Sequence, residues 1–161
     1  MALFNMADLR AKLRRGQRLV GIDPGQKTLG IALSDVMLML ASPYAQWPRG
    51  KLAPIAMELR RLAQREGVGG LVVGLPLSMD GTLGPAAQAA RDWAHALQDA
   101  TGLPTALWDE RMSSQAVNRQ LIEVEDATRQ RRAASVDRMA AAWMLQAALD
   151  ASAPPDPMSD G

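Results

Sequence analysis

The sequence predicts an α/β protein built on one mixed five-stranded sheet with helices on both faces. Two short apolar runs, 19–22 and 29–33, flank a Pro24-Gly25 turn, which is typical of an antiparallel hairpin. Further along, apolar runs at 70–74 and 104–108 alternate with segments of helical periodicity. Such alternation favours parallel strands joined by helical crossovers. Three antiparallel strands followed by two parallel additions are therefore expected.

The composition fits a single globular domain. The chain has 161 residues, 48% hydrophobic and 22% charged, which allows a core of ordinary size. It has no cysteine and one histidine, so disulfides, thiolate zinc sites and His-rich metal sites are excluded. Aromatic residues make up 4%, too few for base stacking to be the main mode of binding. We expect residues 1–150 to form the domain and residues 151–161, with three prolines, a disordered tail.

Apolar side chains repeat at helical spacing in three segments, residues 6–13, 54–66 and 85–100. Gly67 and Gly102 would end the second and third helices. His95 lies off the apolar stripe of its helix and is expected to face solvent. An edge-like third strand is expected at 44–47, because Ser42-Pro43 precedes it.

The C-terminal third of the chain is predicted to be helical with one charged interruption. Ser113 is placed as the N-cap of a helix that ends at 122. Residues 123–132 are highly charged and are expected to form a loop. Ser135 is placed as the N-cap of a last helix over 136–149.

The net charge of +1 does not by itself indicate a nucleic-acid-binding protein. The distribution is uneven, however, because residues 1–30 carry six basic and two acidic side chains. A second basic cluster consists of Arg129, Arg131, Arg132 and Arg138. These clusters would suit a phosphate-attracting surface, and two solvated helix ends explain them equally well. No apolar run has the length of a membrane span or a signal peptide, so a cytoplasmic protein is expected.

Three acidic residues fall at the ends of predicted elements. Asp23 ends the first strand, Glu110 follows the last strand, and Asp137 lies in the first turn of the last helix. The carboxyl ends of adjacent parallel strands meet at one edge of an open α/β sheet, where ligands bind. Three carboxylates without His or Cys suit Mg²⁺ or Mn²⁺. Such a set can hold two ions about 4 Å apart and hydrolyse a phosphodiester without a covalent nucleophile.

Each of these residues also has an ordinary structural explanation. Asp before Pro-Gly is common in turns, and Gly25 in that turn is expected to take a positive φ. Glu110 could pair with the neighbouring Arg111, and Asp137 would complement the helix dipole. Asp109 competes with Glu110, because adjacent strand residues face opposite sides of a sheet. Residue chemistry alone leaves these alternatives open.

Four segments in order, however, match a known pattern. They are Gly-Ile-Asp-Pro-Gly-Gln-Lys-Thr-Leu-Gly-Ile-Ala-Leu-Ser-Asp at 21–35, Val-Val-Gly-Leu-Pro-Leu-Ser-Met-Asp-Gly-Thr at 72–82, Asp-Glu-Arg-Met-Ser-Ser at 109–114 and Val-Asp-Arg-Met-Ala-Ala-Ala at 136–142. Together they resemble the YqgF/RuvX family of pre-16S ribosomal RNA nucleases, also described as Holliday-junction-resolvase-like. One such motif is weak, whereas four in the right order are not expected by chance.

The resemblance implies an RNase H-like fold and a nuclease that processes the 5′ end of precursor 16S rRNA, with branched DNA as the alternative substrate. It implies that Asp23, Glu110 and Asp137, the acidic trio, are the catalytic residues and hold two Mg²⁺ or Mn²⁺ ions. Substrate contacts are expected from Lys27, Ser78, Arg111, Arg131 and Arg132. The expected partners are structured RNA or branched DNA and the assembling small ribosomal subunit, with no membrane, and the chain would be a monomer or a homodimer.

The sequence departs from the family pattern in ways that bear on substrate preference. Pro24 stands where the family more often has an aromatic or aliphatic residue, and Gln26 replaces a threonine. A lysine often found before the last helix is missing, a loss that Arg131, Arg132 or Arg138 could offset. None of these changes removes a carboxylate of the acidic trio.

Two other classes of protein also fit part of the pattern. An actin-like or sugar-kinase ATPase lobe uses an Asp-x-Gly turn after its first strand but needs a second phosphate loop, and this chain has one such turn. A non-catalytic RNA- or ribosome-binding module would keep the fold without turnover. The intact acidic trio argues against it.

Overall fold

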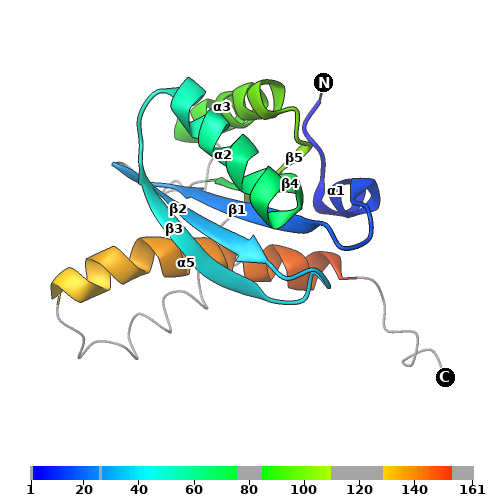
Figure 1. Cartoon of the computed structure of the whole chain (residues 1–161). Helices are drawn as coiled ribbons and strands as arrows, with labels where there is room; N and C mark the ends of the chain where they lie inside the picture. The colour runs from blue at the N-terminus through cyan, green and yellow to red at the C-terminus, as the bar shows by residue number, and fades with distance from the viewer. Residues whose placement is uncertain (1, 26, 76–84, 110–128, 154–161) are drawn as a thin grey trace.

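The computed structural model describes residues 2–25, 27–75, 85–109 and 129–153, and over 129–138 it describes the course of the backbone alone. Five strands form one sheet in the order β3-β2-β1-β4-β5 (Figure 1). They are β1 Arg18–Pro24, β2 Thr28–Ser34, β3 Ala41–Pro48, β4 Val68–Leu75 and β5 Thr105–Asp109. The pairs β1·β2 and β2·β3 are antiparallel, and β4 and β5 add in parallel. The predicted mixed sheet is confirmed.

Helices cover both faces of this sheet (Figure 1). Those named by the structure are α1 Met6–Lys12, α2 Leu52–Glu66, α3 Pro85–Thr101 and α5 Arg129–Ser152. One apolar cluster joins the sheet to α2 and α3, and a second joins the opposite face to α1 and α5. In the described part of the chain, no helix is both long and apolar enough to cross a membrane.

The strand residues divide between these clusters by simple alternation. Val20 and Ile22 of β1 face α2 and α3, whereas Leu19 faces α5. Gly21 lies on the α5 side as well, where a Cβ added to it would stand 2.8 Å from the Cβ of Leu145. The missing side chain at Gly21 therefore lets α5 pack directly on the central strand.

The start of the last helix was predicted wrongly. The helix α5 begins at Arg129, so residues 129–132 are helical and Ser135 is not an N-cap. Asp137 consequently lies two turns inside the helix. It is too far from the helix N-terminus for an interaction with the helix dipole to explain its presence. The physical reason is that Arg, Gln and Ala are strong helix formers and no Gly or Pro interrupts the charged run. The predicted helix that ends at residue 122 lies outside the described residues.

The other end of α5 also differs from the prediction. The helix ends at Ser152, inside the segment 151–161 that the sequence assigns to a tail. Ser152 Oγ donates to Ala148 O at 2.6 Å, and the Arg10 guanidinium contacts both Leu149 O and Ser152 Oγ at 3.4 Å. These contacts tie the last turn of α5 to α1. Residues 154–161 lie outside the described part of the chain.

The third strand lies at the edge of the sheet as predicted, although it begins earlier, at Ala41. It contains Pro43, which an edge strand tolerates because one side of its backbone has no ladder to complete. The register shifts beside Pro43, between Ile31 and Ala32 of the neighbouring strand. His95 is exposed on α3, as its position off the apolar stripe predicts.

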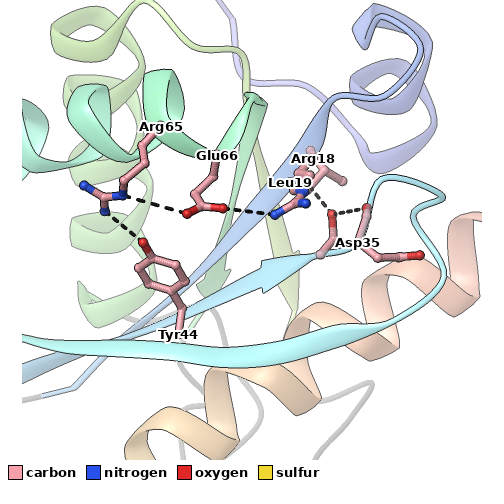
Figure 2. A network of polar contacts seen from close by, with 7 residues as sticks. Arg18, Leu19, Asp35, Tyr44, Arg65 and Glu66 are labelled. Carbon is pink, nitrogen blue, oxygen red and sulfur yellow. Dashed lines mark hydrogen bonds and ion pairs between the residues drawn. The ribbon is translucent and has the colours of Figure 1, made fainter.

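A chain of polar contacts joins α2 to the start of β1 and to β3 (Figure 2). Arg65 donates to the Tyr44 hydroxyl at 2.8 Å and lies 3.8 Å from Glu66, which pairs with Arg18 at 3.1 Å. Beside them, the Leu19 backbone N–H donates to Ser34 Oγ at 2.8 Å. Arg18, Glu66 and Arg65 are thus ion-paired with one another at this end of the sheet.

Candidate active site

Asp23 lies where the central strand of the sheet ends. It is half-buried and pairs with Gly30 of β2. Ile22 pairs with Val73, Gly74 pairs with Trp108, and the parallel strands β1, β4 and β5 therefore end at nearly the same level. The predicted meeting of strand ends at one edge of the sheet is confirmed, and Asp23 lies at that edge.

Strand alternation shows which face of the sheet carries Asp109, the last residue of β5. Asp23 is two residues after Gly21, which faces α5, so it lies on the α5 side of the sheet. Trp108 packs against the cluster on that same side, whereas Leu107 packs against the opposite cluster. Asp109 therefore lies on the face of α2 and α3, away from Asp23. Glu110 lies outside the described residues.

A compact turn follows Asp23 and is held by the end of β3. The Gly25 N–H donates to Thr28 O at 2.8 Å, and the Arg49 backbone N–H donates to Lys27 O at 2.8 Å. The Arg49 guanidinium also donates to Gly25 O. Gln46 Nε2 donates to Thr28 Oγ1 at 3.2 Å. Contacts from β2 and from the end of β3 thus hold the turn that begins at Gly25, two residues after Asp23.

The expectation of a positive φ at Gly25 is wrong, since positive φ values at described glycines occur at Gly16, Gly67 and Gly102. The need for glycine is steric instead. A Cβ at Gly25 would stand 2.9 Å from Thr28 O, closer than real Cβ atoms normally come to another atom. The turn closes so tightly on itself that any side chain would push it open.

The structure describes only part of the predicted site. Lys27 is exposed in the turn beside Asp23. Ser78, Glu110 and Arg111 lie outside the described residues. Arg131, Arg132 and Asp137 lie on α5, whose backbone alone is described there. Within the described part of the chain, no group of three acidic, His or Cys side chains is close enough to hold a metal.

The N-terminal half of the helix α5 lies toward the Asp23 end of the sheet. Its C-terminal half meets the opposite end, where Gln146 Oε1 accepts from Ala41 N at 2.8 Å and Nε2 donates to Met39 O at 2.8 Å. Leu145 lies over Gly21, near the middle of β1. The N-terminal half of α5, which contains Asp137, therefore extends in the direction in which β1 ends (Figure 1).

The six basic side chains of residues 1–30 do not form one surface. Residues 10–15 belong to α1 and the segment after it, at the end of the sheet where β1 begins. Arg18 is paired with Glu66. Of the six cations that the sequence groups together, Lys27 is the one beside Asp23. Of the two explanations that the sequence left open, a single phosphate-attracting surface is therefore disfavoured, because β1 separates Lys27 from the others by about 20 Å, at roughly 3.3 Å per residue.

Arg49 and Gln46 were missed by the sequence analysis. Both stand at the end of β3, which is parallel to β1 in space because two antiparallel pairings separate them. Its last residues therefore lie beside the end of β1. The available signal was the basic segment Arg49-Gly50-Lys51, which begins two residues after the predicted edge strand at 44–47.

Comparison with known proteins adds to this geometry. Residues 17–151 match the sequence pattern of the family described as "RuvX: Holliday junction resolvase". The chain belongs to the RuvX family. A "Putative pre-16S rRNA nuclease" of Gluconacetobacter diazotrophicus is 67% identical over 153 residues, covering 95% of this chain and 99% of the relative. A protein of the same name from Gluconobacter oxydans is 59% identical over 157 residues, covering 98% of each chain.

A solved structure shares the RuvX chain's fold at low sequence identity. "T. thermophilus RuvC in complex with Holliday junction substrate" aligns with a TM-score of 0.50 and 17% identity, over 84% of this chain and 94% of that one. The likeness concerns the fold alone. It confirms the RNase H-like α/β fold that the sequence motifs imply, with the mixed five-stranded sheet at its centre.

Proposed function

We propose that this RuvX chain is a metal-dependent endonuclease that processes the 5′ end of precursor 16S rRNA. The family makes it a nuclease, a hydrolase of phosphodiester bonds. The rRNA substrate is proposed from the names of its relatives. The observation that carries the site is the position of Asp23, half-buried at the end of the central strand and level with the ends of β4 and β5.

Strand and helix positions support the acidic trio. Trp108 shares the face of Asp23, and Glu110 comes two residues after Trp108 in the sequence. Asp137 precedes Ala141 by four residues, about one helical turn, and Ala141 is fully buried between α5 and the sheet. Asp109 is not included in the proposed acidic trio, because it lies on the face of the sheet that carries α2 and α3.

The donor chemistry fits a hard divalent cation. Asp23 offers carboxylate oxygens from a strand position whose backbone is fixed by pairing with Gly30. On the neighbouring strand β4, Gly74 lies at the level of Asp23 and has no side chain. On β5, at the same level, the buried Trp108 Nε1 has no hydrogen-bond partner among the described residues. Asp23, Glu110 and Asp137 would hold two Mg²⁺ or Mn²⁺ ions, which activate water and offset charge on the leaving oxygen.

The other proposed residues bind and orient the substrate. Lys27 stands beside Asp23 on the exposed side of the turn and would contact a backbone phosphate. Ser78 and Arg111 are proposed for the same role from their places in the family motifs. Arg131 and Arg132 are proposed for it because they could replace the lysine that the family often has before the last helix. We place the enzyme in the cytoplasm, with the assembling small ribosomal subunit as its partner. A four-way DNA junction is the second candidate substrate, because the family is described as a resolvase.

The proposal is tested by incubating the purified chain with a 5′-extended 16S rRNA precursor or a four-way DNA junction, in Mg²⁺, Mn²⁺ or EDTA. Asp23→Asn should lose cleavage by about 100-fold or more while RNA binding and folding persist, because it removes a metal ligand and leaves the strand unchanged. Asp109→Asn is the matched control and should cleave like the wild type, because it changes a neighbouring carboxylate on the opposite face.

Each outcome of this experiment has a distinct meaning. Metal-dependent cleavage of the RNA that is lost in Asp23→Asn supports both the site and the substrate. Cleavage of the junction alone would keep the site and move the function to DNA. Tight RNA binding by the wild type without cleavage in any metal would favour the non-catalytic binding module and contradict the proposed enzyme.

A further inference from the structure

We infer that Lys27, Arg49 and Lys51 form a binding surface for the phosphodiester backbone of the substrate, directly beside Asp23. These three residues are called the turn-end cluster. The inference rests on the proposed nuclease function and adds two residues, Arg49 and Lys51, that no sequence motif indicates. It also gives the exposed end of the edge strand a role in holding the nucleic acid.

The sheet register brings the turn-end cluster together. Lys27 stands in the β1–β2 turn, and its neighbour Thr28 pairs with Pro48, the last residue of β3. Arg49 follows at once, with its backbone N–H on Lys27 O at 2.8 Å. Lys51 is the N-cap residue of α2. Three cations from the turn, the end of β3 and the start of α2 therefore gather at one corner of the sheet.

The charges of the turn-end cluster are available to a ligand. All three side chains are exposed. By contrast, Arg18 and Arg65 are engaged with Glu66 (Figure 2). Arg61 is paired with Glu58. Among the residues that the structure describes, none forms an ion pair with Lys27, Arg49 or Lys51. Unneutralised cations close together attract a polyanion, and their release of its counterions makes binding salt-dependent.

The backbone beneath these cations is held by hydrogen bonds to Arg49 and within the turn. Gly25 O accepts from Arg49, Lys27 O accepts from the Arg49 backbone, and Thr28 O accepts from the Gly25 N–H. A guanidinium has five N–H donors, so the contact with Gly25 O leaves others for phosphate oxygens. A rigid frame lowers the conformational entropy that binding would otherwise cost.

The distance to Asp23 suits adjacent phosphates of one strand. Gly25, which the Arg49 guanidinium contacts, is two residues beyond Asp23, or about 7 Å of extended chain. A nucleic acid whose scissile phosphate lies at Asp23 would therefore place a neighbouring phosphate at the turn-end cluster. The cluster acts by positioning the strand, and its residues take no part in the chemical step.

The test measures binding against salt concentration in EDTA, so that no cleavage occurs. The site variant is Lys27→Gln, Arg49→Gln, Lys51→Gln. The control variant, Lys12→Gln, Arg14→Gln, Arg15→Gln, removes the same charge from exposed residues at the opposite end of the sheet. The probes are the 5′-extended 16S precursor RNA and the four-way DNA junction. With wild type as reference, the slope of log K against log[salt] should become shallower by about 2 in the site variant alone, at roughly 0.7–0.9 per lost phosphate contact.

Five further outcomes are informative. Equal slope changes in both variants would mean that net charge matters and position does not, which overturns the inference. A site variant that melts earlier but keeps the wild-type slope would reduce Arg49 to a structural clamp and also overturn it. The charge-preserving variant Lys27→Arg, Arg49→Lys, Lys51→Arg should restore the slope. A wild type that binds neither probe would refute the proposed function as well. An unchanged slope in the site variant, with metal-dependent cleavage by the wild type in a parallel assay with Mg²⁺, would refute this inference alone.

Discussion

Gly25 controls the shape of the turn after Asp23 through the side chain that it lacks. Because a Cβ there would stand 2.9 Å from Thr28 O, we expect Gly25→Val to destabilise the chain by about 1–3 kcal/mol and to reduce cleavage. Urea unfolding and cleavage rates measure the two effects. Gly50→Val is the matched control, because a Cβ at Gly50 meets no atom within 4 Å. Wild-type stability and activity in Gly25→Val would contradict the steric account.

Asp35 predicts a pH dependence of stability. Its Oδ1 accepts the backbone N–H groups of Leu40 at 2.9 Å and Met39 at 2.7 Å. The Leu40 hydrogen bond is the main cause of a pKa below the ordinary value of 3.8. The folded pKa lies below the unfolded one, so the stabilisation is complete above the unfolded pKa and is lost as pH falls through the folded pKa.

We therefore expect Asp35→Ala to lower the free energy of unfolding at neutral pH, with a smaller difference from the wild type well below pH 3.8. Urea unfolding of both proteins across this range measures it. The same loss at every pH would mean that the carboxylate charge contributes nothing and that only the side-chain contacts matter.

Single residues also show what sequence can and cannot predict about the site. Asp23 was predicted at a strand end, because an apolar run followed by Pro-Gly is a local signal. Arg49 could not be predicted, because its contact with Gly25 depends on the register of β2 and β3. Gly25 was recognised as special for the wrong reason, since the sequence does not tell a positive φ from a close approach.

At the scale of elements, α5 and β1 form the contact on which the acidic trio depends. A Cβ at Gly21 would lie 2.8 Å from Leu145 Cβ. Gly21→Ala should therefore push α5 away from the sheet, with a cost of about 1–3 kcal/mol and a loss of cleavage, because α5 carries Asp137. Thermal melts and cleavage rates measure this, with Gly50→Ala as the control. Full activity in Gly21→Ala would show that the site tolerates a shift of the helix.

The elements themselves were predicted with uneven success. The strands β1, β2, β4 and β5 were found within two residues at each end, because buried apolar runs between turn residues are a strong local signal. The start of α5 was missed by seven residues, since its charged first turns have no apolar stripe to mark them. A helix that extends beyond its packed face gives no periodic signal there.

At the scale of the whole molecule, we expect the folded unit to end just after Ser152. Deleting residues 154–161 should leave the melting temperature and cleavage unchanged. Deleting 150–161 should destabilise the chain by about 1–2 kcal/mol, because Gln146 loses Asp150 and Arg10 loses Ser152. Calorimetry on both truncations tests this, and equal destabilisation by the two would contradict the boundary.

The antiparallel start and the parallel additions to the sheet followed from the order of strand and helix signals, because right-handed crossovers between parallel strands allow few alternatives. The strand order β3-β2-β1-β4-β5 comes from the structure. The meeting of β1, β4 and β5 at one edge follows from that topology. The turn-end cluster depends on the corner between β3 and α2, which local patterns do not describe. The fold was thus more predictable than the surface beside the site.

Both open edges of this sheet are obstructed. On one side β3 includes Pro43 and Pro48, which lack the N–H groups that a further strand would need. On the other side, Phe4 bridges to Ala106 and its N–H donates to Thr105 O at 2.9 Å, so the N-terminal segment covers part of β5. At high concentration this protein should therefore resist edge-to-edge aggregation. The few residues before α1 contribute to this resistance by covering part of β5.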